Sequence, residues 1–242
     1  QHRVMLIIFL GAWTHGWIGF MMCSELPNYL TDLGLDLESA GYLSTIPFIG
    51  VFCGNIAFGR MFKYLEDEKG WTVTEVRRMS LIIGQGVSSI CLTIAGFLSS
   101  VPLAFFFTVL CLTFYGASNS CLGCCYLDVA PRFSAQFNAV GNTFSALGGI
   151  ASPLFVAQIL GMFPGNPDDA IHTCDGGDCD DDIAPGKWGW TVVFLLTAAQ
   201  GWTTIILWSL VYKPDVIPEL NTPRAEQKST AMDDENLKAR LI

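Results

Sequence analysis

The chain has 242 residues, a formal net charge of −9 and an apolar content of 51%, while only 14% of its residues are charged. So many apolar and so few charged residues are typical of a membrane bundle and not of a soluble domain. No basic stripe is present, which argues against a nucleic-acid partner.

Six long apolar runs follow one another along the chain. Each has about the 20 residues that an α-helix needs to cross the hydrocarbon of a bilayer. They predict an all-α, polytopic membrane protein with six transmembrane helices. The runs are Val4–Leu26, Gly41–Gly59, Met79–Val101, Leu103–Leu127, Phe133–Phe163 and Trp188–Tyr212. The sequence opens on Gln1 without a signal-peptide pattern, so we expect a piece of a longer protein.

The positive charge lies almost entirely on one side of these runs. Five cations fill the loop between the second and third runs, Arg132 lies between the fourth and fifth, and Lys187 falls on the opposite side. Loops rich in Lys and Arg face the cytosol, so both ends of this segment are expected there. We expect residues 1–212 to form the bundle and the polar, proline-containing residues 213–242 to form a disordered cytosolic tail.

The nine cysteines fall into two groups. Seven lie inside predicted helices, where small apolar packing is their ordinary role. Cys174 and Cys179 flank a Gly-Gly turn in an acidic outer loop. A local disulfide fits this pattern if that side is oxidising, and free thiols in a solvated loop fit it too. Cys121, Cys124 and Cys125 could suggest a metal, but a continuous helix presents these thiols on different faces and no His is nearby. The acidic loop lacks the spacing of an EF-hand, so no metal site and no cofactor are predicted.

The fifth run combines small and polar residues at helical spacing. Gly141, Ser145 and Gly149 repeat every four residues and predict a groove for close packing of a neighbouring helix. Asn138 and Asn142, also four apart, form a polar stripe beside it. This stripe could line a substrate pathway, or it could hold helices together by hydrogen bonds.

His15 is the one ionisable side chain near the middle of a run. A charge at that depth costs several kcal/mol, so such residues usually face a cavity or a partner. Contact with an anion or relay of protons is one reading, and a neutral His bonded to a neighbouring helix is the other. Other residues near mid-span that could line the same pathway are Trp17, Phe20, Tyr115 and Asn119.

Short segments from the first run to the sixth match, in order and with near-matching gaps, the motifs of one family of carriers. They are Leu26–Leu30 (L-P-N-Y-L), Leu37–Pro47 (L-E-S-A-G-Y-L-S-T-I-P), Val76–Arg78 (V-R-R), Leu127–Phe133 (L-D-V-A-P-R-F), Asn142 with Pro153, and Trp190–Phe194 (W-T-V-V-F). From about Gly11 to Tyr212 the chain resembles the anion–cation symporter family of the major facilitator superfamily.

This resemblance implies a particular architecture. The chain would be the second half of a twelve-helix carrier, helices seven to twelve, with the N-terminal six-helix half as its partner and the substrate site between the halves. Four positions depart from or vary within the family pattern. His15 stands where members carry Arg or His, Phe20 where many have Tyr, Lys63 where Asp is usual, and Tyr126 where His is usual.

The resulting hypothesis is a secondary active transporter of a small organic or inorganic anion, coupled to H⁺ or Na⁺ by alternating access. An enzyme is not expected, because no nucleophile arrangement or phosphate-binding loop is present. One rival hypothesis is a transport-inactive relative acting as a receptor or scaffold. Another is a six-helix channel or intramembrane protease complete in itself, for which the sequence has no twin pore motif and no Gly-x-Ser-Gly nucleophile.

Overall fold

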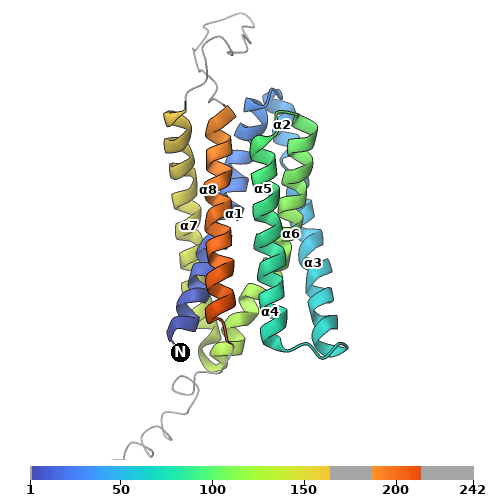
Figure 1. Ribbon diagram of the computed structural model, residues 1–242, viewed down its shortest axis with the longest axis vertical. Coiled ribbons are helices and arrows are strands. Elements are labelled where there is room, and N and C mark those ends of the chain that lie inside the picture. Colours follow the sequence, from blue (N-terminus) through green and yellow to red (C-terminus); the bar gives the residue numbers. More distant parts are fainter. Residues whose placement is uncertain (1, 164–186, 214–242) are drawn as a thin grey trace, which may run out of the picture.

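The computed structural model describes residues 2–163 and 187–213 (Figure 1). Within them the chain forms eight α-helices, one π-helical stretch and one 3₁₀ turn. The elements are α1 (His2–Asp32), α2 (Leu37–Leu43), α3 (Ile46–Asp67), α4 (Val73–Leu81), η1 (Ile82–Val87), α5 (Ser88–Phe97), α6 (Val101–Val129), η2 (Pro131–Phe133), α7 (Ser134–Met162) and α8 (Lys187–Val211). The pair Cys174 and Cys179 and the predicted tail from residue 214 onward lie outside the described residues.

Six stretches of the described chain are long and apolar enough to cross a membrane. They overlap the six predicted runs, although the second span extends to Asp67 and the third begins at Val73. The all-α prediction is confirmed. Three of them combine more than one helical element, and the fifth joins the 3₁₀ turn η2 to α7. The second combines α2 and α3, which meet at Ser44 and Thr45, and the third joins α4 to α5 through the π-helical stretch η1. Pro27 and Pro153 lie inside continuous helices, as membrane bundles tolerate.

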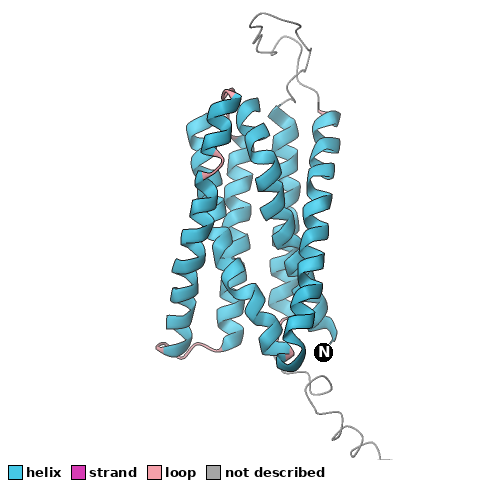
Figure 2. Cartoon of the chain, turned by 180° about the vertical axis from the view of Figure 1, so that it is seen from behind, coloured by secondary structure: helices cyan, strands magenta, loops and turns pink. Residues whose placement is uncertain are grey.

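The long helices run side by side along the long axis in a single bundle (Figures 1 and 2). The N-terminus lies at the end where α3 turns into α4 and α6 turns into α7. The structure extends α3 to Asp67 and begins α4 at Val73, so most of the predicted cationic loop 60–78 is helical. These cations and Arg132 gather at one end of the bundle. Three buried apolar clusters fill the interior, and the largest packs Met21, Tyr29, Leu112 and Phe194 between α1, α6 and α8.

Glycines allow the closest helix crossings. A Cβ added at Gly54 of α3 would lie 2.0 Å from the Thr113 carbonyl oxygen of α6, and one at Gly116 would lie 2.7 Å from the Asn55 nitrogen. Such distances are far inside van der Waals contact, so these helices approach backbone to backbone, as small residues permit in membranes. This crossing of α3 and α6 was not predicted from the sequence.

The predicted groove on α7 faces two different helices. Ser145 lies against Gly16 of α1, where an added Cβ would come within 2.1 Å of the Ser145 carbonyl oxygen. Gly149 faces the ring of Phe20 on α1, whereas Gly141 faces the Tyr126 hydroxyl on α6. The small residues of α7 therefore serve contacts with both α1 and α6.

Candidate functional site

A cavity of about 160 Å³ lies between α1, α6 and α7. Its walls combine polar side chains with small or apolar ones, and no Lys, Arg, Asp or Glu is among its lining residues. The lining consists of Ala12, His15, Asn119, Leu122, Gly123, Tyr126, Asn138, Gly141, Asn142 and Ser145.

His15 is held on one wall of this cavity by several contacts. It is only 8% exposed, and its ring stacks on Tyr115 with centroids 4.0 Å apart. The Tyr115 hydroxyl donates to the His15 carbonyl oxygen at 3.1 Å. Nε2 of His15 lies 3.2 Å from Asn119 Oδ1, and Nδ1 of His15 lies 3.3 Å from Ser118 Oγ. The imidazole is therefore fixed in position and orientation.

The partners of His15 determine which of its nitrogens carry protons. Asn119 Nδ2 donates to Asn55 Oδ1 at 3.1 Å, which leaves Asn119 Oδ1 to accept from an Nε2–H group of His15. The Ser118 hydroxyl has two acceptors within reach, His15 Nδ1 and the Tyr115 carbonyl oxygen at 2.9 Å. When it donates to Nδ1 the ring is neutral. When it donates to the carbonyl it is free to accept from a protonated Nδ1, so rotation of one hydroxyl accommodates both states.

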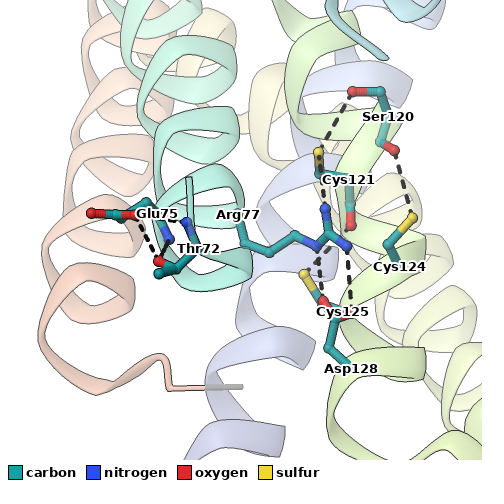
Figure 3. Close-up of polar contacts among 8 residues, drawn as sticks. All are labelled: Thr72, Glu75, Arg77, Ser120, Cys121, Cys124, Cys125 and Asp128. Carbon is teal, nitrogen blue, oxygen red and sulfur yellow. Dashed lines mark hydrogen bonds and ion pairs between the residues drawn. The ribbon is translucent and has the colours of Figure 1, made fainter. Parts of the chain in front are cut away.

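A partly buried ion pair lies outside this cavity and joins α4 to α6 (Figure 3). Arg77 Nε donates to Asp128 Oδ2 at 2.8 Å and Nη2 donates to Oδ1 at 3.4 Å, with the two side chains 11% and 17% exposed. Arg77 Nη1 also lies 3.9 Å from Cys121 Sγ. At the start of α4, Thr72 and Glu75 form a capping box, which satisfies the first backbone N–H groups. The start of the third span is thereby fixed against α6.

Several known carriers are similar in sequence to this chain, although no protein-family model matches it. Human sialin is 24% identical over 86% of this chain and 38% of its own length. The mouse sodium-dependent phosphate transport protein 3 is 30% identical over 60% of this chain and 31% of its own length. A solved structure of a proton:xylose symporter of the major facilitator superfamily superposes on 88% of this chain and 45% of its own, with a TM-score of 0.53 and 15% identity, which concerns the fold alone.

The chain is related to the anion–cation symporters of the major facilitator superfamily. It spans about a third of the length of the curated relatives it matches.

In this symporter-like bundle, helices far apart in sequence bring most of the predicted pathway residues together. His15, Asn119, Asn138 and Asn142 all line the one cavity, and Tyr115 stacks behind His15. Their convergence from α1, α6 and α7 is the geometry expected of a site built between helices.

Two predicted pathway residues of the symporter-like bundle lie elsewhere. Trp17 donates from Nε1 to Thr197 Oγ1 of α8 at 3.3 Å, and its ring meets Phe155 edge-on at 5.3 Å. Phe20 is 51% exposed and lies against Gly149. Neither is among the residues lining the cavity, so their role in a substrate pathway stays a prediction.

Asn55 and Tyr126 are polar residues of this site that were absent from the predicted pathway. Asn55, on α3, accepts the hydrogen bond that orients Asn119. Its one signal in the sequence is that it is an amide inside an otherwise apolar run. Tyr126, which is only 2% exposed, forms part of the cavity wall. In the sequence it is notable only as a departure from the symporter pattern.

Proposed function

We propose that this chain is the C-terminal six-helix half of a secondary active transporter that moves a small anion by alternating access, coupled to H⁺ or Na⁺. Support comes from relatives that include sialin and a sodium-dependent phosphate transport protein. Further support comes from a fold that covers 45% of a proton:xylose symporter. In such carriers the substrate site lies between two six-helix bundles.

The observation that carries the proposal is the cavity around His15. An ionisable side chain at this depth is costly unless it serves a partner or an aqueous path. Its ring nitrogens have neutral partners, Ser118 and Asn119, and the other titratable side chains beside it are Tyr115 and Tyr126. Protonated His15 would attract the substrate anion, and loss of that proton would weaken the attraction and favour release.

The partner half is assigned to the face of the bundle that α3 and α7 flank, at opposite edges in Figure 1. In the apolar stretches of the spans that contain α3 and α7, only 17% and 22% are buried, against 44–61% in the other four. Asn119, Asn138 and Asn142 are exposed, so a second bundle on this side would enclose the cavity between the halves. Both ends of the segment are assigned to the cytosol, because the cationic loops lie at one end of the bundle.

Gradient-driven uptake tests this function directly. The full-length protein is reconstituted in sealed vesicles, and labelled glutamate, inorganic phosphate and glucuronate are offered under an imposed H⁺ or Na⁺ gradient. Accumulation of at least one anion, abolished when the gradient is collapsed, is the expected result. If none accumulates while the protein remains folded in the vesicles, the transport-inactive receptor or scaffold is the correct reading.

A further inference from the structure

The cavity beside His15 has a chemical character that narrows the substrate. It contains six polar side chains, and each can be neutral at pH 7: His15, Asn119, Tyr126, Asn138, Asn142 and Ser145. Amides and hydroxyls both donate and accept hydrogen bonds, whereas an anion such as phosphate offers mainly acceptors. None of the lining residues is an Arg or Lys. The lining thus lacks the permanently charged side chain, such as the planar guanidinium of Arg, that proteins normally use to bind an anion.

Two amides on α7 are available for a ligand. Asn138 and Asn142 are one helical turn apart, so their side chains lie on the same face. Both are exposed, both line the cavity, and the described part of the chain supplies neither with a hydrogen-bond partner. Two free amides one turn apart present four N–H donors and two carbonyl acceptors to whatever enters.

The hydroxyl of Tyr126 is a third polar group without a hydrogen-bond partner among the described residues, and it supports a ligand site independently of the two amides. This side chain is 2% exposed, and its oxygen has no hydrogen-bond partner among the described residues. A Cβ added at Gly141 would lie 1.7 Å from it, so only glycine leaves room for the hydroxyl at this point of the wall. A buried, unpartnered hydroxyl costs about 1–3 kcal/mol, so a group that bonds to it recovers that cost.

We propose that this cavity binds the hydroxyl-bearing part of the substrate, which makes the substrate a hydroxylated organic anion and not inorganic phosphate. Hydroxyl groups match the mixed donors and acceptors of Asn138, Asn142 and Tyr126. The cavity, at about 160 Å³, is smaller than the roughly 300–1,000 Å³ of a complete ligand site. It accordingly holds one part of the substrate, while the carboxylate lies toward His15 and the partner half. This inference rests on the proposed transport function.

A matched pair of six-membered-ring carboxylates tests the inference in vesicles containing the full-length protein. Glucuronate carries hydroxyls on its ring, and cyclohexanecarboxylate carries none. We expect labelled glucuronate to be taken up and cyclohexanecarboxylate to compete at least about tenfold more weakly, because a site built to bond hydroxyls rejects an analogue that lacks them.

Variants locate the effect within the cavity. Tyr126→Phe and Asn142→Leu should each raise KM for glucuronate about tenfold with little change in kcat, and should narrow its advantage over cyclohexanecarboxylate. The matched control is Tyr212→Phe, because Tyr212 is equally buried and its hydroxyl lies beside the Cys125 thiol, but it does not line this cavity. It should leave the preference unchanged.

Two results would overturn the inference while leaving anion transport intact. One is gradient-driven uptake of phosphate without uptake or binding of glucuronate, with binding measured as thermal stabilisation of the protein. The other is equal competition by the two ring carboxylates. Failure of glucuronate, glutamate and phosphate all to accumulate would instead remove the proposed function, and this inference with it.

Discussion

At His15, each ring nitrogen has one neighbour, and only the neighbour of Nδ1 can change its role. Asn119 is fixed as an acceptor by its bond to Asn55, whereas the Ser118 hydroxyl can turn between His15 and the Tyr115 carbonyl oxygen. A proton can thus be gained or lost at Nδ1 without rearrangement of the helices. This is the property that a proton-coupled carrier would require of the residue.

Ser118→Ala tests that role. The variant removes the oxygen that accepts from protonated Nδ1, and bonds to charged groups are about twice as strong as neutral ones. The protonated ring therefore loses more stabilisation than the neutral ring. The profile of uptake against pH should shift to lower pH, with maximal uptake retained. The matched control is Ser80→Ala, whose hydroxyl bonds only to the Ala117 carbonyl oxygen. A profile identical to that of the parent protein would show that Ser118 is a packing residue.

At the scale of the helices, the crossing of α3 and α6 depends on residues without side chains. Gly54 and Gly116 allow backbone contact there, and this contact positions Asn55 beside Asn119. The geometry of the cavity is therefore coupled to the packing of a helix that does not line it.

Gly116→Ala is expected to destabilise the bundle although alanine favours a helix by about 1 kcal/mol. The new Cβ would lie 2.7 Å from the Asn55 nitrogen and 2.9 Å from the Val51 oxygen, and overpacking of this kind costs about 1–3 kcal/mol. Gly123→Ala on the same helix is the control, because nothing lies within 4 Å of its added Cβ. Thermal unfolding in detergent should give a lower Tm for Gly116→Ala only, and equal Tm values would contradict the crossing.

Asp128→Asn addresses the ion pair between α4 and α6. The change keeps the shape of the side chain but leaves the Arg77 guanidinium, 11% exposed, without its counter-charge. Removing one partner of a fully buried pair lowers the free energy of unfolding by about 3–5 kcal/mol. Because this pair is partly hydrated, its loss should lower the free energy of unfolding by less, about 1–3 kcal/mol. A fall in Tm measures it, and the exposed acid variant Glu68→Gln is the control. Unchanged stability would mean that the pair contributes nothing net.

At the scale of the whole molecule, the sequence was sufficient to predict the number and approximate limits of the spans. The reason is that apolar length alone decides whether a segment can cross a bilayer. It was not sufficient for the break at Ser44 and Thr45. It was also not sufficient for the π-helical stretch at 82–87, where Gly84 packs against the Ser118 backbone of α6.

The candidate site could be predicted only in part, because hydrophobicity in a fully apolar helix does not reveal which face points inward. Successive residues turn by 100°, so Trp17 lies about 200° around the helix from His15. The structure accordingly directs Trp17 to α8 and His15 to the cavity. Asn55 was missed because its role depends on Asn119, 64 positions away.

The orientation of the bundle is tested by cysteine labelling. In a background in which native reactive thiols have been replaced, Lys69→Cys and Asp175→Cys are exposed to an impermeant thiol reagent on intact cells. The distribution of Lys and Arg predicts labelling at 175 and protection at 69. Permeabilised cells, in which both positions should react, are the control. The reverse pattern would place the termini on the opposite side.

The central claim is that the cavity around His15 belongs to the path of the transported anion. Its most direct test is uptake by the full-length protein from about pH 5 to 8, which brackets the ordinary imidazole pKa of about 6.5. His15→Phe, which has a ring but never a charge, should lose most transport, and His15→Arg should keep some transport with a flattened pH profile. Thr14→Val is the control, because Thr14 is buried next to His15 in sequence but bonds to Thr204, and it should transport like the parent. If His15→Phe also transports like the parent with an unchanged pH profile, His15 only packs helices together and the claim is wrong.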